Sequence, residues 1–204
     1  MNRELADGHA LRFLPQRAMQ DKSLADMLTR EKLDAVVLCW RNATRVRVNR
    51  MVRGHLELNG RPPQVGEPLV ALRNYPPVYN GMRGLVTTEF APLEDWWMLR
   101  GSLEFPDEGV EPTSHEICRD QFHRERPFDS LDDLEKAGIK VFSMSGAGHL
   151  YDFGYAITVH KSQGSQFKHV VVVADWRQDY SQENTRRLAY TAVTRAAERL
   201  TVLT

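Results

Sequence analysis

The chain has 204 residues, equal numbers of basic and acidic side chains (27 each), and two cysteines. This length holds one large domain or two small ones, and the composition is that of a globular protein with a core. Two cysteines are too few for a disulfide framework, no apolar run approaches the ~20 residues of a membrane span, and the N-terminus lacks the apolar segment of a signal peptide. We therefore expect a cytoplasmic protein with free thiols at Cys39 and Cys118 and no membrane partner.

The N-terminal part is predicted to alternate helix and strand. Residues 21–32 place leucine and methionine side chains on one helical face. Residues 34–40 are apolar on both faces, which is typical of a strand inside a parallel sheet. A second helix is expected to run through Arg53, with Asn42 or Thr44 as its capping residue.

The middle of the chain, residues 60–149, is predicted to form a separate β unit. It is rich in proline and glycine, which interrupt short apolar runs. Its acidic sequence also lies between two basic flanks. We expect a small inserted domain that resembles a β-barrel and ends in a helical tail. The expected elements are strands at 69–72, 85–88 and 96–105, a hairpin turn at 79–81, and helices at 114–124 and 131–137.

The C-terminal part is predicted to return to alternating strands and helices. Because pieces of sheet lie at both ends of the sequence, the simplest topology is one α/β domain interrupted by the β insert. This α/β domain comprises residues 1–59 and 150–204. The expected elements are strands at 151–159, 170–174 and 200–203, a helix start near 160–163, and an amphipathic helix over 182–198.

The run YAITVHKSQGSQ, residues 155–166, changes abruptly from apolar to polar. A strand that leads into a helix start directs backbone N–H groups and hydroxyls outward, and this geometry suits an anion such as phosphate. A helix cap with solvent contacts is the alternative. The side chains expected to contribute are Thr158, His160, Lys161 and Gln163, with Gly164 allowing close backbone approach.

The run LAYTAVTRAAERL, residues 188–200, has an apolar stripe and a separate polar face. Thr194 and Arg195 on the polar face are suited to reach a neighbouring phosphate. The alternative is a surface arginine that forms a salt bridge with Glu183 or Glu198. The apolar stripe is expected to consist of Leu188, Ala192, Val193 and Ala196.

Other chemistries are disfavoured by the sequence. None of the 13 glycines precedes a lysine, so the chain has no Walker A phosphate loop, and Asp175 after VVVVA is expected to follow a plain central strand. His115, Cys118 and His123 lack a fourth ligand and zinc-site spacing, so no metal site is expected. No glycine elbow surrounds Ser162, which argues against a hydrolase nucleophile.

Four segments in order resemble superfamily-1 DNA helicases, in particular the RecD-like branch with its UvrD-like C-terminal region. ITVHKSQGSQF at 157–167 and LAYTAVTRAAERL at 188–200 resemble motifs V and VI. Residues 35–53 resemble the motif IV region. Residues 65–86 resemble the Src-homology-3-like domain that these helicases insert in their second RecA-like domain.

This resemblance implies a RecA-like domain that supplies a catalytic arginine finger, Arg195, to the γ-phosphate of ATP. Gln166 stands where many relatives carry glutamate. The nucleotide-binding residues implied are Gly164, Gln166, Arg41 and Thr194. The DNA-binding residues implied are Thr158, His160, Lys161, Gln163, Asn80 and Arg83.

The resemblance also implies that this chain is half of a larger machine. Nothing in it resembles motifs I to III, so ATP and Mg²⁺ would be held by a missing N-terminal RecA-like domain. The expected function is an ATP-dependent helicase that moves 5′→3′ on single-stranded DNA, with no ATPase activity in this chain alone. The alternatives are a stand-alone module that binds single-stranded DNA or a protein, and a degenerate structural remnant.

Overall fold

A computed structural model describes residues 2–4, 10–175 and 181–204, and divides the chain into two compact units. The first unit comprises Met1–Asn59 and Tyr155–Thr204, and the second comprises Gly60–Gly154. The first contains a largely parallel sheet with helices, and the second an antiparallel sheet, so the predicted α/β class is confirmed. Within the described ranges, no helix is long and apolar enough to span a bilayer.

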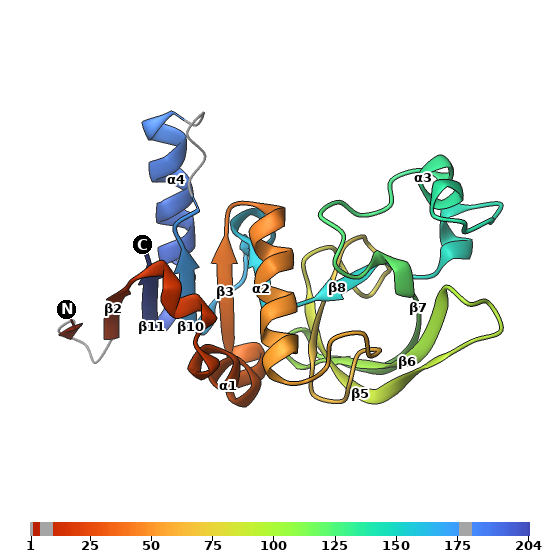
Figure 1. Ribbon diagram of the computed structural model, residues 1–204, viewed down its shortest axis with the longest axis horizontal. Helices are drawn as coiled ribbons and strands as arrows, with labels where there is room; N and C mark the ends of the chain where they lie inside the picture. The colour runs from red at the N-terminus through yellow and green to blue at the C-terminus, as the bar shows by residue number, and fades with distance from the viewer. Residues whose placement is uncertain (1, 5–9, 176–180) are drawn as a thin grey trace. The chain divides into compact units, whose positions relative to one another are not determined.

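The sheet of the first unit has six strands in the order β1-β2-β11-β10-β3-β9 (Figure 1). Every neighbouring pair is parallel except β1 and β2. Strand β3, between β10 and β9, is buried along its whole length, as its apolar sequence predicts. The strands are β1 (Asn2–Glu4), β2 (Ala10–Leu14), β3 (Ala35–Cys39), β9 (Ala156–Thr158), β10 (Phe167–Val173) and β11 (Ala196–Leu203).

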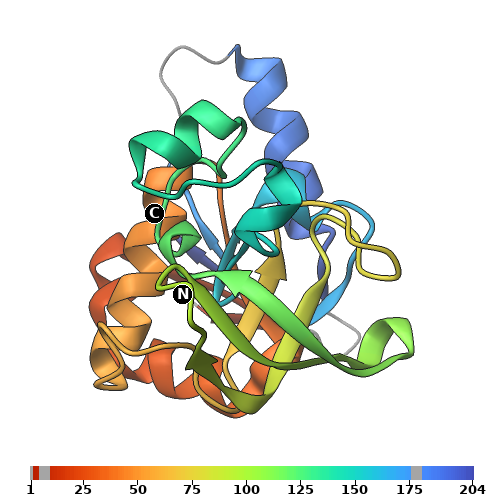
Figure 2. The ribbon, with the colours of Figure 1, turned by 90° about the vertical axis from the view of Figure 1, so that its right-hand side faces the viewer.

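Helices cover both faces of this sheet (Figure 2). The crossovers from β2 to β3 and from β3 to β9 both run toward the β9 edge of the sheet. Because crossovers between parallel strands are right-handed, these two place α1 and α2 on the same face. The crossovers from β9 to β10 and from β10 to β11 run in the opposite direction, so they place α4 on the other face. The helices are α1 (Lys22–Glu31), α2 (Asn42–His55) and α4 (Gln182–Val193), with 3-10 helices η1 (Gln16–Gln20), η2 (Lys32–Asp34) and η6 (Val159–Ser162).

The second unit is a five-stranded sheet in the order β7-β6-β5-β4-β8, with all neighbours antiparallel. A bridge between Ile117, near the end of β7, and His149, just before β8, links its two edges. The strands are β4 (Pro68–Ala71), β5 (Arg83–Pro92), β6 (Met98–Phe105), β7 (Val110–Cys118) and β8 (Tyr151–Phe153). The helices are α3 (Leu131–Lys136) and the 3-10 turns η3 (Pro106–Glu108), η4 (Arg119–Gln121) and η5 (Met144–Ala147).

The helix predicted at 114–124 is wrong, because this segment forms most of β7. His115 and Ile117 are buried, whereas Ser114 and Glu116 between them are exposed, and this alternation is that of a strand. Pairing with β6 therefore determined the local structure. The helix predicted at 131–137 is confirmed by α3.

The strand predicted at 151–159 is also wrong as a single element. It is divided at Gly154, so that β8 pairs with β4 in the second unit and β9 pairs with β3 in the first. A side chain at Gly154 would approach the backbone of Leu69 and Pro68 to within 3.3 Å. This close approach explains why a glycine stands where the chain passes between the two sheets.

The predicted helix caps and the predicted end of α4 differ from the structure. The N-cap residue of α2 is Arg41, which makes no side-chain capping bond, so neither Asn42 nor Thr44 has this role. Helix α4 ends at Val193 and not at residue 198. Strand β11 already begins at Ala196, where it pairs with Phe167. Of the predicted apolar stripe of α4, Ala192 is buried, Leu188 and Ala196 are half-buried, and Val193 is exposed.

Two histidines face each other in the second unit. The Nδ1 atoms of His115 and His149 are 3.2 Å apart, and the Nε2 atom of His115 lies 2.9 Å from the Thr113 hydroxyl. The hydroxyl of Tyr151 also lies 3.3 Å from Nδ1 of His115. Burial, with a smaller contribution from His149, lowers the pKa of His115 to about 4.

This low pKa predicts an acid-sensitive second unit. The pKa of His115 is about 6.5 in the unfolded chain and about 4 in the folded chain, so the folded chain binds this proton only at lower pH. The contribution to stability is therefore complete above pH 6.5 and is lost as the pH falls toward 4. Between pH 7.5 and 5.0 we expect the wild type to lose about 2 kcal/mol more than His115→Gln, measured by urea denaturation. His55→Gln is the control, and parallel pH profiles for wild type and His115→Gln would contradict the prediction.

Candidate functional site

The crossovers of the first unit change direction between β3 and β10, and ligands of parallel sheets commonly bind at the carboxyl edge of such a switch point. Arg41 follows β3 at this edge, and Thr158 ends the neighbouring strand β9. Asp175, just after β10, accepts hydrogen bonds from the backbone N–H groups of Trp40 (2.8 Å) and Arg41 (3.1 Å). Asp175 thus fixes the turn that carries Arg41.

The polar run after β9 forms a short 3-10 helix and a turn, where an α-helix start was predicted. Helix η6 ends at Ser162, whose hydroxyl is buried and donates to the carbonyl of Val159 at 2.8 Å. Gln163 (φ −61°, ψ 130°) and Gly164 (φ +87°) then form a type II turn closed by Ser165 N–H and the Ser162 carbonyl. The expected α-helical N-terminus is therefore replaced by a tight loop.

Gly164 is the position in this loop that requires glycine. Its φ of +87° lies in the left-handed region, where a Cβ is strained although the space around it is open. We expect Gly164→Ala to lower the free energy of unfolding by about 1–2 kcal/mol. Gly164→Asn should be milder, because asparagine tolerates this conformation better. Urea denaturation of both variants is the measurement, and equal losses for the two would contradict this explanation.

Arg195 lies in the short connection between α4 and β11. Its guanidinium donates from Nη1 to the carbonyl of Ser165 (3.1 Å), from Nε to the carbonyl of Thr191 (3.2 Å), and from Nη2 to the hydroxyl of Thr194 (3.3 Å). Among the described residues no carboxylate forms an ion pair with Arg195, and Glu183 pairs with Arg187 at 2.6 Å. The alternative that Arg195 is a surface partner of Glu183 or Glu198 is therefore wrong.

The guanidinium of Arg195 brings the two polar runs together. Ser165, which accepts its hydrogen bond, lies between Gly164 and Gln166, both of which are exposed. The backbone reinforces this contact, because Phe167 N–H donates to the Arg195 carbonyl at 2.9 Å. Three of the predicted nucleotide-binding residues, Gly164, Gln166 and Thr194, thus lie around Arg195. A half-buried guanidinium held by neutral oxygens keeps its full positive charge for an anion.

The other predicted residues lie elsewhere. Arg41 lies at the carboxyl edge of β3, as the N-cap residue of α2. Lys161 is half-buried, and burial followed by the charge of Arg45 lowers its pKa. In the second unit, Asn80 is exposed in the turn before β5, whereas Arg83 is buried and donates to the Gly154 carbonyl at 3.0 Å.

Asn49 is a residue of this region that the sequence analysis missed. It is fully buried on α2, and its amide group both accepts from the N–H of Ala156 (2.8 Å) and donates to the carbonyl of Ala156 (3.3 Å). Strand β9 lies at the edge of the sheet, so its outer backbone groups need partners other than a strand. The Asn49 side chain supplies them at Ala156, which lies two residues before Thr158. A polar residue between the apolar positions Val48 and Val52 was the available signal.

Residues 153–203 match the family described as the UvrD-like helicase C-terminal domain. No curated protein matches the chain. Among solved structures, the Pif1 helicase from Candida albicans is 15% identical with a TM-score of 0.48, and the match covers 92% of this chain and 51% of that one. The Pif1 helicase from Bacteroides in complex with ADP-AlF3 and ssDNA is 15% identical with a TM-score of 0.46, covering 91% and 47%. The chain therefore spans about half the length of these proteins.

Proposed function

We propose that this chain is the second RecA-like part of an ATP-dependent DNA helicase of superfamily 1, of the RecD-like branch. The observation that carries this proposal is the Arg195 cluster. It joins the segments that resemble motifs V and VI, and both lie within the region that matches the UvrD-like helicase C-terminal domain. A structural remnant has no need for an arginine without a carboxylate partner beside an exposed glycine turn.

In this proposal Arg195 reaches the γ-phosphate of ATP that another domain holds. The chain has no Gly-Lys pair for a phosphate loop, so the missing N-terminal RecA-like domain would bind ATP and Mg²⁺. The Ser165 and Thr191 carbonyls that accept from Arg195 are neutral, so a charged phosphate oxygen would form stronger bonds with the same guanidinium. Gly164, Gln166 and Thr194 would line the nucleotide.

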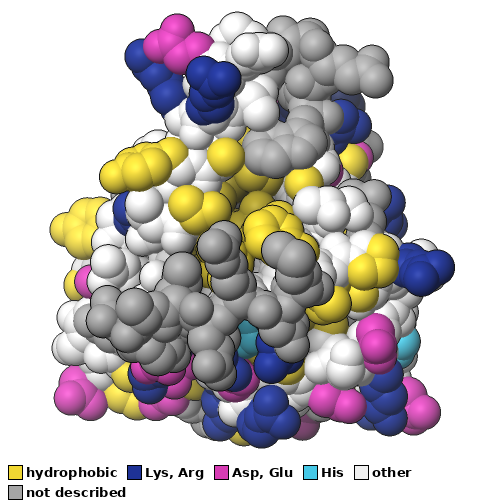
Figure 3. Space-filling model, turned by 90° about the vertical axis from the view of Figure 1, so that its left-hand side faces the viewer, with side chains coloured by type: hydrophobic (Ala, Val, Ile, Leu, Met, Phe, Trp, Pro, Cys, Tyr) yellow, Lys and Arg dark blue, Asp and Glu magenta, His cyan; other side chains and the backbone are white. Residues whose placement is uncertain are grey.

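The surface around α4 offers a place for that missing domain. The helix is largely exposed, with Tyr190 and Val193 exposed at 70% and 37%, and Phe13 of β2 is also exposed. Figure 3 shows hydrophobic side chains gathered near the centre of the face seen there. We propose that the ATP-binding domain covers part of this face when the site closes.

DNA would contact the same loop from the β9 side. His160 and Lys161 lie within η6, and Thr158 and Gln163 are its N-cap and C-cap residues. Closure and opening around ATP would then shift this loop and its grip on the DNA backbone. The second unit would act as a Src-homology-3-like guide for the strand, with Asn80 on its surface, and movement would be 5′→3′.

Binding of single-stranded DNA by the chain tests this proposal directly. We expect a fluorescein-labelled oligo(dT) to bind in anisotropy titrations, with affinity that falls steeply between 50 and 200 mM salt because phosphate contacts dominate. His160→Ala and Lys161→Ala should each weaken binding, whereas Lys168→Ala, an exposed lysine paired with Asp34, should not. Absence of binding at 50 mM salt, or equal effects of all three variants, would overturn the assignment.

A further inference from the structure

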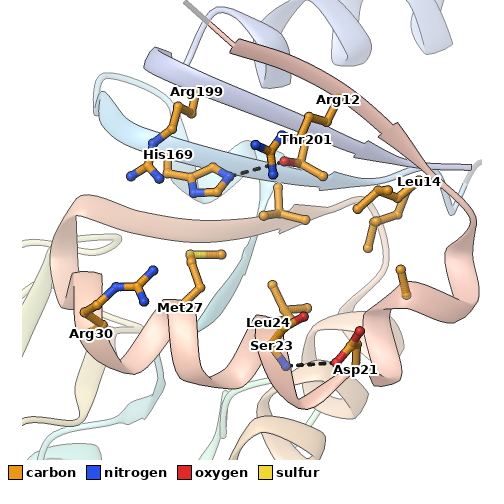
Figure 4. A pocket seen from close by; sticks show the side chains of 13 residues that line it. Arg12, Leu14, Asp21, Ser23, Leu24, Met27, Arg30, His169, Arg199 and Thr201 are labelled. Atoms are coloured by element: carbon orange, nitrogen blue, oxygen red, sulfur yellow. Dashed lines mark hydrogen bonds between the residues drawn. The ribbon is translucent and has the colours of Figure 1, made fainter. Parts of the chain in front are cut away.

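A pocket of about 390 Å³ lies on the α1 face of the first sheet, opposite the face that α4 covers (Figure 4). Alternate residues of β2, β10 and β11 form its floor, and α1 with η1 forms its wall. Its volume lies within the range of small-molecule sites. None of its lining residues belongs to the Arg195 cluster or to the loop at 158–166, so it is a separate site.

One end of this pocket is basic. Arg12 of β2 and Arg199 of β11 flank His169 of β10, and both arginines lower the pKa of that histidine, although burial lowers it most. Arg30 lines the pocket from the end of α1. Glu31 compensates part of this charge, since its carboxylate accepts from Arg199 at 2.7 Å and lies 3.6 Å from Arg30.

Arg12 is the arginine of this pocket whose charge Glu31 does not balance. Within the described residues its guanidinium forms no ion pair or hydrogen bond, and its side chain is exposed at the pocket. His169 does not add charge at neutral pH, because its pKa is lowered, and its Nε2 atom lies 3.2 Å from the Thr201 hydroxyl. The positive field at this end therefore comes from arginines.

Most of the remaining lining is apolar. Leu24 and Met27 of α1 face Val171 and Leu203 of the sheet across the pocket, and Leu14 of β2 borders it. The Asp21 carboxylate lies among these residues, and it accepts the Ser23 N–H at 3.0 Å as the cap of α1. An anion placed here would be repelled by Asp21, whereas at the arginine end it would be attracted.

We infer that this pocket binds a small organic anion with an apolar body, whose anionic group meets Arg12 and Arg199 and whose hydrocarbon part contacts Leu24 and Met27. A guanidinium group holds a carboxylate, sulfonate or phosphate group by charge-assisted hydrogen bonds. The size of the pocket limits the hydrocarbon part to about one aromatic ring system or a short alkyl chain. This inference does not rest on the helicase assignment, because it uses the opposite face of the sheet.

The fluorescent anion 1-anilinonaphthalene-8-sulfonate is a suitable probe, because it combines naphthalene with one sulfonate. We expect it to bind the 204-residue chain at one site, and Arg12→Gln and Arg199→Gln to weaken this binding about tenfold each, the loss of one charge-assisted bond. Arg50→Gln, an exposed arginine of α2 outside the pocket, should leave the affinity unchanged. N-phenyl-1-naphthylamine, which lacks the sulfonate, should bind all four proteins equally.

Two competitors distinguish the source of such an anion. Octanoate represents a free carboxylate, and an acetylated dipeptide that ends in phenylalanine represents the carboxyl terminus of a chain. Displacement of the probe by either compound supports the inference and names the source, whereas displacement by neither overturns it. Equal probe affinity of wild type, Arg12→Gln and Arg199→Gln would also overturn it. Binding of single-stranded DNA by Arg12→Gln should be unchanged, so failure here and failure of the proposed function remain distinguishable.

Discussion

Replacement of Arg195 by alanine is expected to lower the rate of ATP hydrolysis by the complete helicase about 10³–10⁵-fold, the effect of an arginine finger on phosphoryl transfer. In the proposed function the guanidinium would stabilise charge that develops on the γ-phosphate oxygens. ATP binding should be preserved, because in this proposal another domain supplies the phosphate loop and the Mg²⁺ ligands. Steady-state kcat and nucleotide affinity of the wild type and variant are the measurements.

Two control variants separate this role from a structural one. Arg195→Lys keeps the charge but loses the planar fork that bonds Ser165 and Thr194, so turnover should still fall strongly. Arg187→Ala removes an exposed arginine of α4 that pairs with Glu183, and its kcat should be close to that of the wild type. The isolated chain should hydrolyse no ATP. Turnover by Arg195→Ala within tenfold of wild type would remove Arg195 from this role.

The sequence predicts the elements that are defined by their own apolar pattern. Strand β3 has a continuous apolar run, and α1 and α2 have helical spacing with a glycine or charged residues at their ends. These patterns need no information from distant residues. The strands β1 and β2 were missed, because β2 is recognisable as a strand mainly through its parallel pairing with β11.

The errors occurred where distant partners decide the structure. Residues 196–198 continue the helical spacing of α4, but parallel pairing of Ala196 with Phe167 places them in β11. As a result Arg195 lies just after the end of the helix, and not on its polar face, where the sequence placed it. The polar residues of the two motifs could be recognised from the sequence. The bond of Arg195 to the Ser165 carbonyl, which joins the motifs, could not be predicted from it.

Asn49→Leu is expected to lower the free energy of unfolding of the first unit by about 2–4 kcal/mol, because it leaves the buried N–H and carbonyl of Ala156 without their partner. Leucine has the same branched arrangement of side-chain heavy atoms and is not smaller, so the loss reports the two hydrogen bonds and not a cavity. Urea denaturation is the measurement. Asn59→Leu, the same change at an exposed position, should alter stability by no more than about 0.5 kcal/mol.

The effect should extend to the candidate site, because Asn49 holds the outer edge of the short strand that ends at Thr158. Because β9 pairs with β3 over only three residues, the two Asn49 bonds should contribute to keeping its register. We therefore expect Asn49→Leu to weaken binding of single-stranded DNA under conditions where circular dichroism shows a folded protein. If the variant binds DNA as the wild type does and unfolds at the same urea concentration, β9 is held by its pairing with β3 alone, and Asn49 has no part in positioning Thr158.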